Sequence, residues 1–150
     1  MTAINESNVE FKFRPVTKLF EEQVALHPDK LAVVTSKESF SYSKLNERAN
    51  RIANALIEKG VQAETIVGVI LERCCDFYAA RQAILKAGGA FTVAAPDYPD
   101  DRIQYIFEDA AIPFVITTKE IEKERQDLFA KLDCKVLLLE ELLENENAEN

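Results

Sequence analysis

The segment that most constrains the fold of this chain is residues 85–103, which read LKAGGAFTVAAPDYPDDRI. Its beginning is typical of a helix end, because Gly88 can adopt the left-handed turn that closes a helix. Residues 90–95 follow as a short apolar run of the strand type. Pro99 then suits a first helical position, and the two aspartates after it favour the positive end of a helix dipole. A helix, a strand and a helix in quick succession are typical of an open α/β sheet.

Strands and helices alternate along the rest of the chain as well. Hydrophobic periodicity predicts helices over residues 16–27, 43–59, 76–87, 99–110 and 119–132, and strands over residues 30–35, 40–42, 66–71, 90–95, 114–117 and 136–139. The first two strands form a hairpin, and we take residues 90–95 as the central strand. Connections between parallel strands are right-handed, so the predicted fold class is α/β, an open, mostly parallel doubly wound sheet with flanking helices.

Local signals predict the helix ends and the buried faces. Asp76 can cap the helix that follows it, and Gly60 can close the long helix before it. Apolar residues at helical spacing predict ordinary core faces. These are Leu45, Ala49, Ile52, Ala53, Leu56 and Ile57 in the second helix, Phe77, Ala80, Ile84 and Ala87 in the third, and Ile103, Ile106, Phe107 and Ala110 in the fourth.

The charge and the cysteines limit the class of partner and the compartment. Acidic residues outnumber basic ones by 26 to 18, and no basic stripe is present, so we expect no nucleic-acid partner. The N-terminal sequence MTAINESNVE has no signal-peptide pattern, and no apolar run is long enough to span a bilayer, so we expect no membrane partner. Three cysteines, two of them adjacent, suit a reducing compartment, and we expect a cytoplasmic location.

Two pairs of adjacent residues, Gly88–Gly89 and Cys74–Cys75, are candidate site residues. Gly88 and Gly89 follow a helix C-terminus, where the partial negative charge disfavours a phosphate, so we interpret them as a cap and a close-packed strand entry. Cys74 and Cys75 have only Cys134 and the lone His27 as further soft ligands, so a zinc site is not expected.

The acidic residues and the histidine do not form a predicted site either. Asp97, Asp100 and Asp101 could hold a metal only together with a phosphate cradle, so helix-start charge is the better account. We expect His27 to cover the carbonyl groups at the end of its helix. Glu108 and Asp109 oppose the dipole at their helix end, which hints at a partner. We therefore assign no catalytic, cofactor-binding or metal-binding residue to this chain.

Two segments carry a resemblance to a known family. LKAGGAF followed by PDYPDDRI resembles the second core motif of the adenylation domains of nonribosomal peptide synthetases, which belong to the adenylate-forming superfamily. FSYSKL, at residues 40–45, is similar to the first core motif, L(S/T)YxEL. The resemblance covers residues 16–139 and implies the N-terminal part of an enzyme that uses ATP and magnesium. The chain departs from the family at Lys44, where glutamate is usual, at Phe91, where tyrosine is usual, and at residues 92–95, where VPID is usual.

The extent of the resemblance divides the chain into three parts. Residues 1–15 are an N-terminal arm, residues 16–139 a truncated adenylation-type α/β domain, and residues 140–150 an acidic tail that we expect to fray. The family's Gly-rich phosphate loop has no match, because the only four glycines are Gly60, Gly68, Gly88 and Gly89. We expect the chain itself to bind no cofactor.

Three functions remain open at this stage. The first is an inactive structural or interaction module of a peptide-synthetase system. The second is the N-terminal piece of an active domain that adenylates an amino acid or other carboxylic acid for transfer to a carrier-protein thiol. The third is an unrelated doubly wound domain that binds a small ligand at the carboxyl ends of its strands. Expected partners are other synthetase domains or a second copy, through an exposed sheet edge or face.

Overall fold

A computed structural model describes residues 13–150, so most of the predicted arm at residues 1–15 lies outside the described residues. The elements in chain order are α1 (Val16–Leu26), β1 (Leu31–Val34), β2 (Ser39–Ser41), α2 (Tyr42–Glu58), β3 (Ile66–Val69), α3 (Cys75–Lys86), β4 (Ala90–Val93), α4 (Asp100–Asp109), β5 (Phe114–Thr117), α5 (Lys119–Glu124), α6 (Gln126–Phe129), β6 (Lys135–Leu138) and α7 (Leu139–Leu142).

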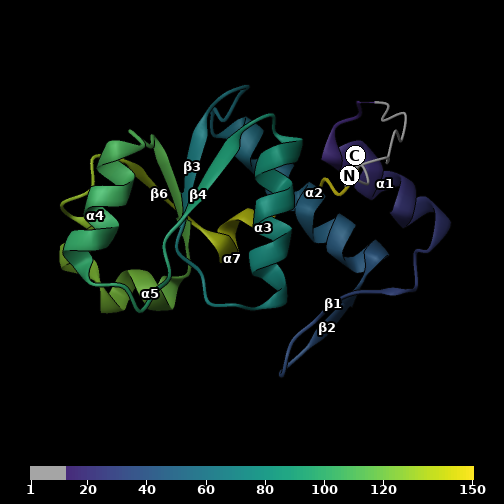
Figure 1. Ribbon diagram of the computed structural model, residues 1–150, viewed down its shortest axis with the longest axis horizontal. Coiled ribbons are helices and arrows are strands. Elements are labelled where there is room, and N and C mark those ends of the chain that lie inside the picture. The colour runs from purple at the N-terminus through teal and green to yellow at the C-terminus, as the bar shows by residue number, and fades with distance from the viewer. Residues whose placement is uncertain (1–12) are drawn as a thin grey trace, which may run out of the picture.

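The main sheet has four parallel strands in the order β4-β3-β5-β6. The chain leaves β3 toward β4 on one side and returns to β5 on the other, so the direction of winding switches between β3 and β5. Helices lie on both faces of this sheet (Figure 1). The predicted doubly wound α/β fold is confirmed. The prediction that residues 90–95 form the central strand is wrong, because β4 lies at the edge.

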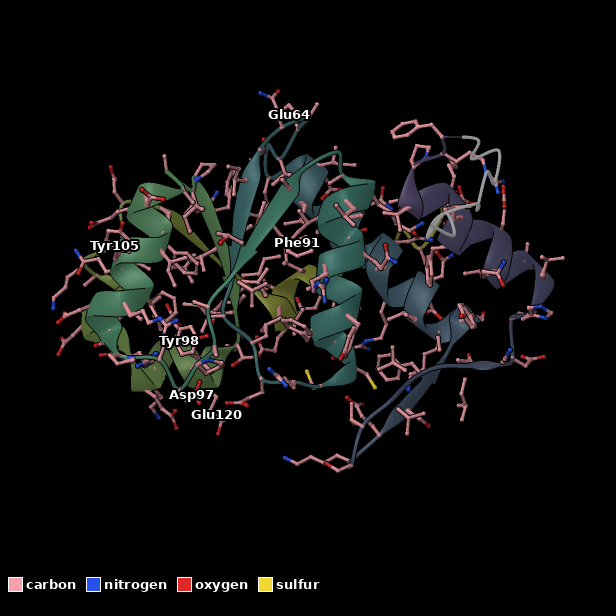
Figure 2. All side chains as sticks on the ribbon, viewed as in Figure 1. Glu64, Phe91, Asp97, Tyr98, Tyr105 and Glu120 are labelled. Carbon is pink, nitrogen blue, oxygen red and sulfur yellow. The ribbon has the colours of Figure 1, made fainter. Side chains whose placement is uncertain are left out.

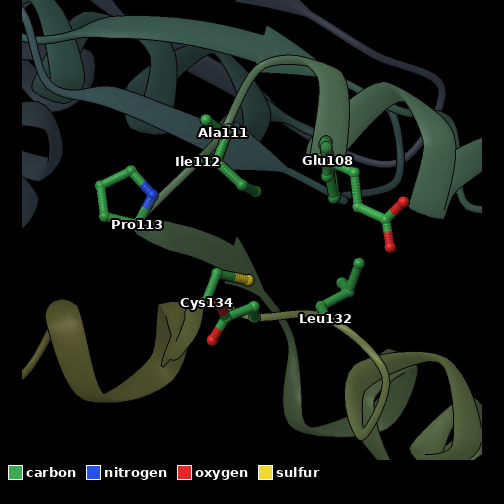
Figure 3. Close-up of a pocket in the computed structure, with 8 residues that line it drawn as sticks. Glu108, Ala111, Ile112, Pro113, Leu132 and Cys134 are labelled. Carbon is green, nitrogen blue, oxygen red and sulfur yellow. The ribbon is translucent and has the colours of Figure 1, made fainter.

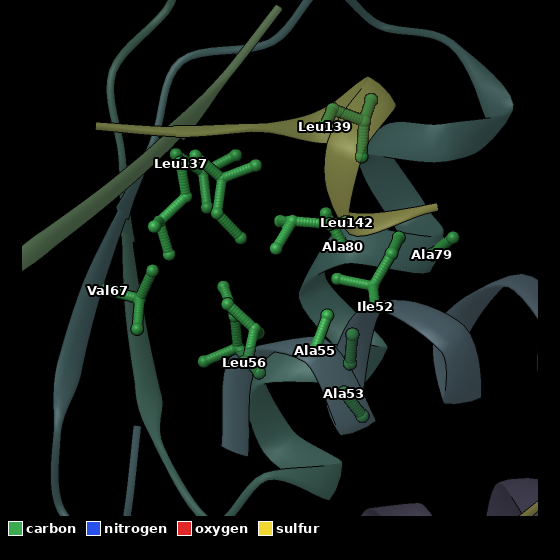
Figure 4. Close-up of a cluster of buried hydrophobic side chains, with 14 of the residues drawn as sticks. Ile52, Ala53, Ala55, Leu56, Val67, Ala79, Ala80, Leu137, Leu139 and Leu142 are labelled. Atoms are coloured by element: carbon green, nitrogen blue, oxygen red, sulfur yellow. The ribbon is translucent and has the colours of Figure 1, made fainter. Parts of the chain in front are cut away.

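Two apolar clusters cover the two faces of the sheet. One packs α2, α3 and α7 against side chains such as Val67 and Leu137 (Figure 4). The other packs α4, α5 and α6 against Ile70 and Val115. Gly68 lets α4 and the turn after it approach closely, because a Cβ atom there would lie 3.2 Å from the Phe107 ring and 2.5 Å from Ile112 Cδ1. The sheet therefore has the two covered faces that the apolar IVGVIL run requires.

The hairpin of β1 and β2 forms a separate two-stranded antiparallel sheet. It is joined to the main body by Glu38, whose carboxylate accepts a hydrogen bond of 3.1 Å from the Cys75 backbone N–H. This bond satisfies one of the free N–H groups at the start of α3. The prediction that Asp76 caps α3 is wrong. Its carboxylate instead forms an ion pair with Arg48 of α2.

The prediction of one continuous helix over residues 119–132 is wrong. The backbone breaks at Arg125, with φ −123° and ψ 38°, into α5 and α6. The Arg125 guanidinium donates to Tyr98 O at 2.6 Å and pairs with Asp100 at 2.9 Å. These contacts fasten the break to the start of α4.

The acidic C-terminal segment, for which the sequence predicts fraying, lies against α2 in the structure. Residues 139–142 form α7, and Leu142 is completely buried against α2 and its neighbours. Residues 145–150 then lie along α2, with the chain end beside α1 and α2 (Figure 1).

Candidate functional site

The two adjacent glycines have the structural roles that the sequence indicated. Gly88 has φ +83° and closes α3. A Cβ atom on Gly89 would lie 2.8 Å from Thr65 O, so only glycine allows this entry into β4 without movement of the backbone. Gly60, with φ +99°, likewise ends α2. These glycines serve packing and helix ends.

The three cysteines and the histidine do not converge. Cys75 is buried at the start of α3, Cys74 is half-buried beside it, and Cys134 lies at the start of β6 within the opposite core. His27 is exposed, and its main-chain N–H closes α1 through Gln23 O at 2.9 Å. Within residues 13–150, no group of three or more His, Cys, Asp or Glu side chains could hold a metal ion.

The three aspartates near α4 have different surroundings. Asp100 pairs with Arg125, whereas Asp97 and Asp101 are exposed. Asp97 and Tyr98 border a cleft of about 500 Å³ at the carboxyl ends of β3 and β4 (Figure 2). Its lining residues are Leu71, Glu72, Arg73, Phe77, Val93, Ala95, Pro96, Asp97 and Tyr98. Carboxyl ends of parallel strands are the usual ligand edge of an open α/β sheet, so this cleft suits a small polar ligand.

An aromatic groove lies between α1, the hairpin, α3 and β4. It encloses about 320 Å³ and includes the side chains of Phe20, Tyr42, Tyr78 and Phe91. The Arg81 guanidinium stacks on Phe91 at 4.7 Å from the ring centroid, and on the ring of Phe77 at 5.4 Å. The groove is therefore mainly apolar with one cation in its wall, which suits an apolar segment of a partner better than a free nucleotide.

A third cavity, of about 430 Å³, opens where the amino ends of β5 and β6 meet α4 (Figure 3). Glu108, which the sequence marked as a possible partner contact, and Cys134 both line it. Burial, with a smaller effect of the Asp133 charge, raises the pKa of the Cys134 thiol to about 11. At neutral pH this thiol is protonated, so the cavity offers no reactive thiolate.

Two departures from the family have local explanations in the packing. Lys44 lies over the Phe40 ring, with Nζ 4.2 Å from the centroid, so the unusual cation gains an aromatic partner within the same motif. Phe91 is the ring on which Arg81 stacks.

Sequence reasoning missed the polar residues Arg81, Asn46, Asn50 and Lys86. The first lies in the aromatic groove, and the other three meet at the chain end. The asparagines occupy successive turns of one helix, which was the available signal. What they contact could not be read from local sequence, because it lies about a hundred residues away.

Comparison with known proteins gave consistent matches. The model of the AMP-binding enzyme family matches residues 20–150. Tyrocidine synthase 1 of Brevibacillus parabrevis is 41% identical over 135 residues, which cover 90% of this chain and 12% of that protein. Gramicidin S synthase 1 of Brevibacillus brevis is 38% identical over 120 residues, covering 79% of this chain and 11% of its own length. This chain thus spans about a tenth of these relatives.

Solved structures show the same fold. The nonribosomal peptide synthetase FmoA3, in a form described as bound to α-methyl-L-serine-AMP, superposes with a TM-score of 0.78 at 32% identity. The match covers 91% of this chain and 15% of that one. The fused adenylation and carrier di-domain NpsA-ThdA from Klebsiella oxytoca has a TM-score of 0.80 at 19% identity, over 93% of this chain and 25% of that one, and so shares the fold.

Proposed function

We propose that this chain, which belongs to the AMP-binding enzyme family, is a non-catalytic lobe of a nonribosomal peptide synthetase adenylation domain and acts by packing against other synthetase domains. Family membership follows from the match over residues 20–150. The resemblance read from the two core motifs is confirmed. The interpretation as an unrelated doubly wound domain is wrong.

The observation that supports this proposal most directly is the structural role of each glycine. Binding of ATP phosphates in such folds relies on a flexible, Gly-rich run of backbone N–H groups. All four glycines of this chain have other roles, because Gly60 and Gly88 end helices while Gly68 and Gly89 allow close packing. Within residues 13–150, no group of three or more His, Cys, Asp or Glu side chains is placed to hold a metal ion, and this arrangement agrees with the proposed non-catalytic role. ATP chemistry would have to come from residues outside this chain.

The surface around β4 supports an interaction role. Among the strands of residues 13–150, β4 lies at the edge of the main sheet, so one side of it has no strand partner there. Val16 and Tyr78, which line the aromatic groove, are 55% and 39% exposed, and Val93 of β4, which lines the cleft at the carboxyl ends of β3 and β4, is 37% exposed. An apolar surface next to an open strand edge is a common site of protein association. Another synthetase domain would bury both features.

The test is ATP–pyrophosphate exchange by the purified, folded chain with each of the common amino acids. We expect no exchange above the blank without enzyme. Amino-acid-dependent exchange by this chain alone would refute a non-catalytic role. A circular dichroism spectrum recorded on the same sample checks that the chain is folded.

A second candidate function is the N-terminal part of an active adenylating enzyme, favoured by 41% identity to tyrocidine synthase 1 over 90% of the chain. Such an enzyme would join a carboxylic acid to ATP, release pyrophosphate, and pass the acyl group from the acyl-adenylate to a carrier-protein thiol. Mixing this chain with the remainder of a related adenylation domain should then restore exchange, and the remainder alone is the control. A correctly folded but inactive mixture would exclude this function.

A further inference from the structure

The outer side of β4 has two pairs of main-chain groups that face away from β3. The N–H groups of Ala90 and Ala94 donate to carbonyl groups of the β3 segment at 2.9 and 3.0 Å, so these two residues face β3. In a parallel ladder, every second residue bonds to a given neighbouring strand. The N–H and C=O groups of Phe91 and Val93 therefore point to the other side, where no strand of residues 13–150 pairs with β4.

The side chains of the same two residues line two hollows on the α3 side of the sheet. Phe91 lines the aromatic groove, and Val93 lines the cleft at the carboxyl ends of β3 and β4. A strand added to β4 would lie about 4.8 Å from it, and every second side chain of that strand would point to the same side of the sheet. Because α3 lies beside β4 (Figure 1), these side chains would enter the groove and the cleft.

Two polar atoms in the wall of the aromatic groove are buried and have no hydrogen-bond partner in the part of the chain that the structure describes. They are Nε of Arg81, which is a donor, and Oε1 of Gln82, which is an acceptor. Buried polar groups in folded proteins are nearly always paired, so both atoms indicate a polar partner. A polypeptide main chain supplies an acceptor C=O and a donor N–H in every residue except proline.

Arg81 also indicates one side chain of the added strand. It is the only charged residue of the groove lining, and none of the ion pairs among the described residues involves it. Its guanidinium stacks on the Phe91 ring at 4.7 Å from the centroid, so the cation lies beside the outer strand of the sheet. A carboxylate on the groove side of an added strand would pair with this cation.

We propose that β4 is the docking edge for a β-strand of another synthetase domain, and that this strand directs apolar side chains and one carboxylate toward the aromatic groove. Its main chain pairs with Phe91 and Val93, and its carboxylate pairs with Arg81. In strand addition of this kind, main-chain bonds give affinity and side-chain pockets give specificity. The inference rests on the proposed packing role, because it names the part of the partner that binds.

The test is an NMR titration of the isotope-labelled full chain with the peptide KTVTETVTK, acetylated and amidated at its ends. In an extended conformation, its valines and its glutamate lie on one face. Val93→Pro removes an N–H that makes no bond to β3 and places a ring at the docking edge, whereas Val93→Ala only shortens the side chain. We expect binding at least about tenfold weaker for Val93→Pro and a change within about threefold for Val93→Ala.

The role of Arg81 is tested in the same titration with the peptide KTVTQTVTK, which has glutamine in place of the glutamate. We expect this peptide to bind about threefold more weakly, since an ion pair that stays partly exposed contributes little. Arg81→Gln should remove the difference between the two peptides. Equal binding of both peptides by the unaltered chain, or a glutamate preference that survives Arg81→Gln, would overturn the assignment of the carboxylate to Arg81.

Equal binding by Val93→Pro and Val93→Ala, or no binding at about 1 mM peptide, would overturn the proposed strand addition. A second measurement covers the case in which Val93→Pro prevents folding. Two forms of the glutamate peptide, N-methylated on alternate sets of residues, are titrated into the unaltered chain. Only one set of N–H groups faces β4 in an added strand, so only one form should lose binding, and equal binding of both would overturn the proposal. Pyrophosphate exchange tests the non-catalytic role separately, so the two failures are distinguishable.

Discussion

Replacement of Leu142 by alanine measures how strongly the C-terminal segment is held. Leu142 is 0% exposed and belongs to the cluster of α2, α3 and α7 (Figure 4). Removal of a fully buried leucine side chain costs about 2–5 kcal/mol, depending on how far the surroundings collapse into the cavity. Because α7 is a single short helix that can shift toward α2, we expect a value in the lower half of that range, about 3 kcal/mol.

Urea unfolding followed by far-ultraviolet circular dichroism provides the measurement. Leu143→Ala is the matched control, since the neighbouring side chain is only partly buried at the edge of the same cluster. We expect this control to lose about 1 kcal/mol, with the same dependence on urea concentration in both variants. A decrease in the free energy of unfolding below about 1 kcal/mol for Leu142→Ala, or equal decreases in the two variants, would refute the packing of α7 against α2. Such a result would support the prediction that the C-terminal segment frays.

Three further predictions concern single contacts. Glu38→Ala should lower the free energy of unfolding by about 1 kcal/mol in the same urea assay, because the start of α3 loses its cap, while Lys37→Ala should change it little. Burial raises the pKa of Glu21, but hydrogen bonds and charges from its two lysine partners lower it more, so it lies below 4.5. The ionised Glu21 carboxylate therefore stabilises the folded chain above pH 4.5, and this contribution to the free energy of unfolding is lost as the pH falls through the lowered pKa. In Lys86→Gln, the free energy of unfolding should fall less steeply with decreasing pH. Cys134, with a pKa of about 11, should react with iodoacetamide at pH 8 about a hundredfold more slowly than a free thiol of pKa 9.0, as peptide mapping can show.

Much of the fold could be predicted from the sequence because its signals are local. The left-handed turn at Gly88 and the run IVGVIL each report their own environment. The apolar spacing of α2 also predicted its buried face, except that Ile57, at the end of the helix, is 53% exposed. The core face of α4 was predicted too broadly, since Ile103 and Phe107 are buried but Ile106 and Ala110 only partly so. Periodicity indicates the direction of a face better than its width.

Other features depended on contacts between distant residues. The strand order is one case, since an apolar run such as residues 90–95 looks alike in the centre and at the edge of a sheet. The break at Arg125 is another, because it depends on Tyr98 O and Asp100. The cap of α3 comes from Glu38, 37 residues earlier, rather than from the nearby Asp76. The contacts of Asn46, Asn50 and Lys86 with Asn150 join α2 and α3 to residues far along the chain, so no single segment could indicate them.

The packing of α7 on α2 also has a consequence for synthesis on the ribosome. α2 is complete at Glu58, yet Leu142, which covers part of its apolar face, is translated about 80 residues later. At rates of about 5–20 residues per second, that face lacks this cover for several seconds. During this interval only α3, β3 and the growing sheet can pack against the apolar face of α2. Chaperones that recognise exposed aliphatic side chains therefore have time to bind to this face.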